Sequence, residues 1–136
     1  MSIEQTVILP RVPKNCYIRL RAHPTWVTIK RMTLQYAIAK WVDAFNRADV
    51  EALIAIYDVD AIHYPASGEP VVGRDAIREL LSIGTTAAPN FKCFVAGVQV
   101  EGGRVILDWH DEGGANGRST FQFDDELIVS ERFEFR

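Results

Sequence analysis

The sequence is poor in the features on which disulfide frameworks, metal centres and membrane spans depend. Its 136 residues include three histidines and two cysteines, Cys16 and Cys93, which lie far apart and form no Cys-x-x-Cys motif. No apolar run approaches the roughly 20 residues that span a bilayer, and the first residues lack the basic and apolar regions of a secretory signal. We therefore expect a cytoplasmic protein with no metal, no cofactor and no membrane partner.

Charge is distributed unevenly although the net charge is only -3. Residues 1–33 hold six basic residues and one acidic residue, a net charge of +5, and the remainder holds nine basic and seventeen acidic residues. A basic arm is typical of nucleic-acid binding, but no aromatic residues alternate with basic ones on a common face and no binding motif is present. We interpret residues 1–32 as an arm of unknown role, lying on the acidic body of its own chain or of a partner subunit.

Three amphipathic helices are expected in residues 33–84. Thr33 can cap the first, and the second follows Asp49 and includes Tyr57. The third runs from about Arg74 and stops at Gly84. The apolar stripe of the first helix consists of Leu34, Ile38, Trp41 and Phe45.

Strands are expected where apolar and polar residues alternate. Two short runs, 16–21 and 26–30, lie in the arm, and residues 61–64 form a strand that closes on the turn at 65–68. Residues 91–100, 104–111, 118–124 and 127–135 then read as a four-stranded meander. Helices followed by an antiparallel meander indicate an α+β domain over residues 33–136.

Four segments together carry a family resemblance. They are residues 41–49 (WVDAFNRAD), 53–61 (LIAIYDVDA), 73–78 (GRDAIR) and 121–129 (FQFDDELIV). With them the chain resembles the SnoaL-like branch of the nuclear-transport-factor-2-like superfamily, which includes ketosteroid isomerases. The resemblance covers about residues 34–136. It implies three N-terminal helices packed on a strongly curved antiparallel sheet, a cone-shaped apolar pocket and a homodimer formed through the sheet.

The catalytic positions of the related isomerases are all changed in this chain. Their oxyanion-donating tyrosine on the first helix corresponds to Trp41, whose indole can donate a hydrogen bond but cannot transfer a proton. Their aspartate base corresponds to Tyr64, with His63 beside it, and only one of these neighbours can face the pocket. Their carboxylic acid on the third meander strand corresponds to Ser119, with Thr120 adjacent.

Asp108 and His110 are the first candidates to replace the lost groups. They lie two residues apart on one strand and share a face, so they would form an acid/base pair inside the cone. By resemblance this face, which includes Ile106, points inward. In the opposite register Trp109 would be the core residue and the pair would lie outside.

Glu131 is the second candidate. It belongs to a mostly aromatic row of the last strand, from Val129 to Phe135, that the resemblance directs into the cone. It could instead pair with Arg118 or Arg132 near the rim. The residues that we expect to line the pocket are Trp41, Phe45, Tyr57, Ile77, Leu81, Ser119, Phe121, Glu131 and Phe133.

The sequence therefore suggests a small-molecule enzyme of the SnoaL-like group. We expect acid/base isomerisation, cyclisation, hydration or dehydration of an apolar cyclic substrate, with Asp108 as base and His110 as its proton partner. Tyr64 or Trp41 would donate a hydrogen bond to substrate oxygen. The alternative is a ligand-binding or dimerisation module that uses the same cone without chemistry.

Overall fold

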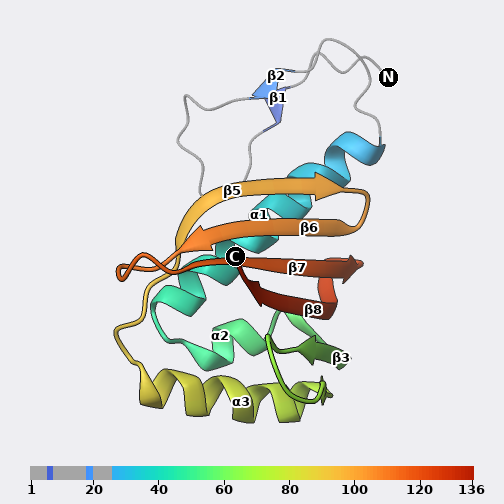
Figure 1. Cartoon of the computed structure of the whole chain (residues 1–136). Helices are drawn as coiled ribbons and strands as arrows, with labels where there is room; N and C mark the ends of the chain where they lie inside the picture. Colours follow the sequence, from blue (N-terminus) through green and yellow to red (C-terminus); the bar gives the residue numbers. More distant parts are fainter. Residues whose placement is uncertain (1–5, 8–17, 20–25) are drawn as a thin grey trace. The chain divides into compact units, whose positions relative to one another are not determined.

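The computed structural model describes residues 6–7, 18–19 and 26–136, with side chains from residue 31 onward. The chain divides into two units, Met1–Lys30 and Arg31–Arg136. In the first, β1 (Thr6–Val7) pairs antiparallel with β2 (Ile18–Arg19) (Figure 1). The strand predicted at 16–21 is thus found at 18–19, and the rest of that range lies outside the described residues.

The three predicted helices are present. They are α1 (Trp26–Asn46), α2 (Val50–Ile54) and α3 (Arg74–Ala87). Asp49 caps α2 as predicted, because its side chain accepts a hydrogen bond of 3.0 Å from the backbone N–H of Ala52.

Three predicted helix boundaries were wrong. The third helix does not stop at Gly84, because α3 continues to Ala87. Residues 26–30 are helical rather than extended, so Thr33 lies inside α1 and does not cap it. No glycine or proline separates these residues from the stripe that follows, so the helix extends back toward Pro24. In addition α2 ends at Ile54, and Tyr57 begins a strand instead of closing the second helix.

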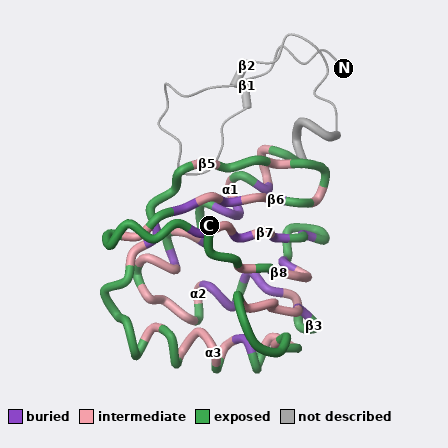
Figure 2. Tube along the Cα trace, in the orientation of Figure 1, coloured by how far each residue is buried: buried purple, intermediate pink, exposed green. Residues whose placement is uncertain are grey.

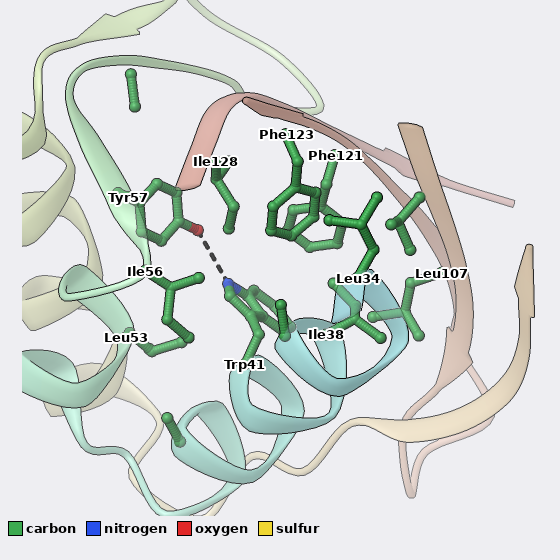
Figure 3. Close-up of a cluster of buried hydrophobic side chains, with 14 of the residues drawn as sticks. Leu34, Ile38, Trp41, Leu53, Ile56, Tyr57, Leu107, Phe121, Phe123 and Ile128 are labelled. Atoms are coloured by element: carbon green, nitrogen blue, oxygen red, sulfur yellow. Dashed lines mark hydrogen bonds between the residues drawn. The ribbon is translucent and has the colours of Figure 1, made fainter. Parts of the chain in front are cut away.

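The main sheet has six strands. It curves around α1, as Figures 1 and 3 show. Its order is β4-β3-β8-β7-β6-β5, and every neighbouring pair is antiparallel except β3 and β8. The strands are β3 (Tyr57–Tyr64), β4 (Val71–Val72), β5 (Phe94–Glu101), β6 (Arg104–His110), β7 (Asn116–Asp124) and β8 (Leu127–Phe135). The predicted α+β class and the four-stranded meander are confirmed.

The core lies between α1 and the concave face of the sheet (Figure 2). Leu34, Ile38 and Trp41 project from α1 toward the buried strand residues (Figure 3). The indole of Trp41 stacks on Phe45 with ring centroids 5.1 Å apart and meets Phe121 edge-on, also at 5.1 Å. The stripe read from the sequence is therefore the face that α1 buries.

A β-bulge changes the phase of β8. Gln122 of β7 pairs with Ser130 whereas Phe123 pairs with Ile128, so Val129 is an extra residue without its own partner on β7. As a result Ile128 and Glu131 are both buried, although they are three residues apart. The prediction that Glu131 faces inward is confirmed. The predicted inward row from Val129 to Phe135 is wrong at its ends, since Val129 is only half-buried and Phe135 is exposed.

Candidate active site

A buried carboxylate stands at the centre of the concave face. Glu131 on β8 is only 4% exposed. Its Oε1 atom accepts a hydrogen bond of 2.5 Å from the Tyr57 hydroxyl and lies 3.1 Å from Nδ1 of His63. The predicted alternative, a pair between Glu131 and Arg118 or Arg132, is not what the structure shows, because Arg118 binds Asp108 and Arg132 stacks on Tyr64. A buried carboxylate without such donors would be costly, so these contacts keep it in place.

The direction of this hydrogen-bond chain follows from its members. The indole Nε1–H of Trp41 can only donate, and it lies 3.0 Å from the Tyr57 oxygen. The single proton of the Tyr57 hydroxyl is then directed to Glu131. Burial, together with the nearby Glu131 carboxylate, holds the pKa of Tyr57 well above its ordinary value. Tyr57 therefore remains a hydrogen-bond donor to the carboxylate.

The same logic assigns the tautomer of His63. Because Oε1 of Glu131 is an acceptor, the neutral imidazole carries its proton on Nδ1 and donates it to the carboxylate. Its Nε2 atom is left with a free lone pair. A carboxylate that orients an imidazole in this way also stabilises the imidazolium that forms when Nε2 accepts a proton.

Sheet pairing brings together residues that are distant in sequence. His63 and Glu131 are direct partners in the parallel pairing of β3 with β8. A register irregularity between Tyr57 and Ile62 lets the Tyr57 side chain reach the same carboxylate from the start of β3. The bulge at Val129 then directs Glu131 to the concave face.

A cavity of about 400 Å³ adjoins this network, and His63 lines it. That volume is in the usual range of small-molecule sites. Apolar walls come from Phe45 of α1, Phe91 of the α3–β5 connection and Phe133 of β8, and Leu80 and Leu81 of α3 complete them. His63 and Thr85 supply the polar side chains of the lining. Phe45, Leu81 and Phe133 are thus predicted pocket residues that do line a cavity.

The other predicted pocket residues lie in the core. Trp41, Tyr57, Ile77, Ser119 and Phe121 are between 0% and 4% exposed and do not line this cavity. Glu131 is not part of this lining, but it contacts His63, which is. The expected donation from Trp41 to a substrate oxygen is wrong, since its N–H is used by the Tyr57 hydroxyl.

The inward orientation expected for Asp108 and His110 is wrong. Val105, Leu107 and Trp109 are the buried residues of β6, so the intervening side chains face outward. Asp108 instead forms a bidentate ion pair with Arg118 on the neighbouring strand, in which Nε and Nη2 of the arginine donate to the two carboxylate oxygens at 2.7 Å and 3.1 Å. Burial sets this register, because placing three large apolar side chains on the concave face gives more favourable free energy than placing an ion pair there would.

Tyr64 also faces away from the cavity. Its ring lies 4.4 Å below the guanidinium of Arg132, an exposed residue on the outer face. Since neighbouring strand residues point to opposite faces, His63 takes the inward position instead. The sequence pattern predicted that only one of these two neighbours faces the pocket, and the hydrogen-bond donor role was given to Tyr64. It did not identify Phe91, which it assigned to a strand.

A second cavity, of about 580 Å³, lies between α1 and β5. Its walls are mostly apolar, from residues such as Ile38, Val42 and Val98. The titratable group in its lining is Asp43, which is exposed and paired with Arg47 at 2.9 Å. This arrangement offers no buried base, so the His63 cavity is the candidate active site.

Among the residues that the structure describes, no group of three or more His, Cys, Asp or Glu side chains is arranged to hold a metal ion. Within the same residues no helix is long and apolar enough to cross a membrane. Burial raises the pKa of the Cys93 thiol to about 11, which disfavours its reactive thiolate form.

Comparisons with known proteins identify the fold family. The model of the SnoaL-like domain matches residues 38–131, and no curated protein matches the chain. A SnoaL-like protein of unknown function from Burkholderia thailandensis E264 is 14% identical, with a TM-score of 0.72 over 78% of this chain and 97% of that one. A nuclear-transport-factor-2-like protein of unknown function from Burkholderia xenovorans LB400 is 25% identical, with a TM-score of 0.70 over 79% and 85%. A proposed SnoaL-like polyketide cyclase from Jannaschia sp. CCS1 is 14% identical, with a TM-score of 0.70 over 76% and 85%.

These structural similarities at low identity establish the fold and leave the reaction open. The matched segment includes both His63 and Glu131, together with the helices that pack against their strands. Over two thirds of its length, the chain belongs to the SnoaL-like domain family.

Proposed function

We propose that this chain is a cofactor-independent enzyme that moves protons on a small, largely apolar molecule. The observation that carries the proposal is the His63–Glu131 pair, in which a cavity-lining imidazole is held at 3.1 Å by a buried carboxylate. This arrangement supplies a general base with a fixed tautomer inside an apolar site. Asp108, His110 and Tyr64, which face outward, have no part in it.

The proposed step is a proton transfer between carbon and His63. Nε2 takes a proton from a carbon next to a substrate carbonyl, which leaves an enolate and an imidazolium paired with Glu131. Return of the proton to a different carbon isomerises the substrate, and return to the same carbon exchanges it with solvent. Attack of the enolate on a second carbonyl would close a ring instead.

The cavity lining favours a flat, uncharged substrate with one oxygen-bearing end. Phe45, Phe91 and Phe133 provide aromatic walls on which a ring can stack. The Thr85 hydroxyl, which bonds the backbone oxygen of Ser82 at 3.2 Å, is the second polar side-chain group that a substrate oxygen can meet. These features support an apolar cyclic carbonyl compound as the substrate class.

Deuterium exchange tests the chemistry without a known product. Steroid enones, aromatic polyketides, terpene epoxides and fatty acids are first screened by thermal shift, and stabilising compounds that contain a carbonyl are incubated with the protein in D₂O. We expect deuterium to replace hydrogen at the carbon next to the carbonyl, and NMR measures the rate of this exchange. His63→Ala should slow it by about 100-fold or more, which is typical for loss of a general base.

Two variants complete the test. Glu131→Gln should also slow exchange, because an amide does not compensate the imidazolium charge. His110→Ala is the matched control, since it removes an exposed histidine from the outer side of β6. Exchange that is equally fast in the His63 and His110 variants would refute the proposal.

A ligand-binding module is the competing function. Its specific support is the loss of all three catalytic residue types of the related isomerases at Trp41, Tyr64 and Ser119. It predicts compounds that stabilise the protein and undergo no exchange in any variant. Stabilisation combined with exchange that depends on His63 would exclude it.

The assembly state and location are part of the same proposal. We expect a homodimer through the outer face of the sheet, which light scattering would detect as twice the 15.3 kDa mass of the chain. Arg132, stacked on Tyr64, lies on that face, so Arg132→Glu should shift the dimer toward monomer.

A reducing cytoplasm is the expected location. Association of the basic arm with an acidic partner would be salt-sensitive and would be lost on removal of residues 1–30.

A further inference from the structure

The connection between α3 and β5 forms part of the cavity wall. Ala88, Pro89 and Phe91 line the cavity, yet residues 88–91 are exposed to solvent on their other side. Within the described residues, the backbone of 89–92 makes one hydrogen bond, from Phe91 N–H to the Ala88 oxygen at 3.2 Å. The other lining residues lie on helices or on the sheet, except Ala48 of the α1–α2 turn, whose backbone N–H bonds the Phe45 oxygen at 3.0 Å. Residues 88–91 are therefore the part of the wall with the fewest backbone restraints.

Phe91 is the largest side chain that this segment contributes. Its ring meets Phe45 edge-on, with centroids 5.9 Å apart, and Trp109 in the same way at 6.1 Å. At 37% exposure it has one side on the cavity and the other on water. The ring therefore lies between the cavity and solvent, and its displacement would break two ring contacts but no backbone hydrogen bond of a helix or a strand.

Asn46 attaches the far end of the segment to α1. Its side-chain amide donates to the Cys93 oxygen at 2.9 Å, and its side-chain oxygen accepts from the Cys93 N–H at 2.8 Å. These two bonds have the same donor and acceptor pattern as a hydrogen-bonded residue pair of two antiparallel strands. Lys92 adds a bond to the backbone oxygen of Asn46 at the C-terminus of α1, where a cation is favourable.

We propose that residues 88–93 are the gate of the active-site cavity, with Phe91 as its moving part and Asn46 as its anchor. The inference deepens the proposed function and rests on the same cavity. Phe91 also limits the size of the ligand that enters, because it closes the wall opposite the fixed elements. Asn46 sets how often the gate opens, because its two bonds to Cys93 must be restored at each closure.

Ligand exchange kinetics and amide exchange test the gate on the full chain. The probe is prodan, a flat, neutral naphthyl ketone whose emission changes when it leaves water, followed by stopped flow. Phe91→Ala should raise the prodan association and dissociation rates by about tenfold, the factor expected for losing one or two aromatic contacts. Phe94→Ala is the matched control, since that ring is similarly exposed, at 41%, but stacks on His110 instead of lining the cavity.

The anchor is tested with a graded pair of variants. Asn46→Ala removes both bonds to Cys93, and Asn46→Asp keeps an acceptor for the Cys93 N–H but loses the donor. Exchange of the hydrogen-bonded amides of Phe91 and Cys93 should accelerate by about tenfold or more in the first variant and less in the second, as expected for ordinary hydrogen bonds. Amides of residues 104–110 should keep their protection, which shows that the fold is intact.

The outcomes separate the gate from the chemistry. Prodan rates that change no more in Phe91→Ala than in Phe94→Ala would refute the gate. Unchanged exchange of the Phe91 and Cys93 amides in Asn46→Ala would refute the anchor. If His63-dependent deuterium exchange is absent while both gate effects are seen, the proposed chemistry fails and the gate stands.

Discussion

Replacing Tyr57 by phenylalanine removes one buried oxygen atom and two hydrogen bonds. The ring itself is 0% exposed and packs identically in the variant, so little cavity is created. The lost bonds are the 3.0 Å bond from Trp41 and the 2.5 Å bond to Glu131. The variant therefore isolates the polar network from the hydrophobic core that surrounds it.

The expected loss of stability is large for a single atom. A hydrogen bond to a charged group contributes about 1.5–3 kcal/mol, and a buried donor left without a partner costs about 1–3 kcal/mol. Because the indole N–H of Trp41 and the Glu131 carboxylate are both affected, we expect about 3 kcal/mol in total. That is a substantial part of the roughly 5–15 kcal/mol by which domains of this kind are stable.

Urea unfolding followed by circular dichroism measures the effect. A loss of about 3 kcal/mol should lower the unfolding midpoint by roughly 1–3 M at an unchanged m-value. Trp41→Phe and the double variant complete a cycle, in which the two substitutions should be less than additive because they share a bond. A loss below about 0.5 kcal/mol would refute the role assigned to the network, because it would be smaller than one ordinary hydrogen bond.

Alkaline titration gives an independent check on Tyr57. Its pKa is raised in the folded state, so above the ordinary tyrosine pKa of about 10 the unfolded chain loses a proton that the folded chain retains. Wild-type stability should therefore fall as pH rises through that value, and Tyr57→Phe should lack this component. An identical alkaline slope in the two proteins would contradict the assigned environment of the hydroxyl.

Three further predictions concern other parts of the fold. Gly117→Ala should destabilise the fold by about 1–3 kcal/mol, because a Cβ there would lie 2.1 Å from the Trp109 ring. Gly97→Ala is the control, since a Cβ there meets no atom within 4 Å, and equal melting temperatures of the two variants would contradict the predicted clash. The arginine bonded to Asp108 lowers the pKa of that carboxyl, so the contribution of the ion pair to stability should be present above about pH 4 and be lost as pH falls further. The urea midpoints of Asp108→Asn should lack this acid-dependent loss. Because burial raises the pKa of Cys93 to about 11, its alkylation at pH 8, located by peptide mapping, should be far slower in the native protein than in urea; equal rates would contradict its burial.

The local elements could be predicted because short-range chemistry specifies them. The apolar stripe beginning at Leu34 marks the buried face of α1, and Asp49 is a strong N-cap whose bond to the following turn is local. The four strands of the meander follow from alternation and from the turns between them. The family resemblance then indicated a curved sheet packed on these helices, and two of the predicted lining residues, Phe45 and Phe133, line the cavity of about 400 Å³.

The candidate site could not be completed in the same way. The alternation on β6 gives two faces, and the sequence does not show which of them is buried. Tertiary packing buries Trp109, whose ring meets Phe91 and Phe133, and this turns Asp108 outward. The inward position of Glu131 agrees with the sequence, but its partners do not follow from it, because the bulge at Val129 and the pairing with β3 are set by other strands.

Sequence alone thus determined the order of the main helices and strands, the fold family and the presence of a carboxylate in a mostly aromatic row. Tertiary structure decided the candidate site, because it brought together His63 and Glu131, which are separated by 68 residues, and added Tyr57 and Trp41 to the same hydrogen-bond network. The physical reason is range: caps and periodicity act within a few residues, whereas a hydrogen-bond network forms wherever strand pairing places donors and acceptors.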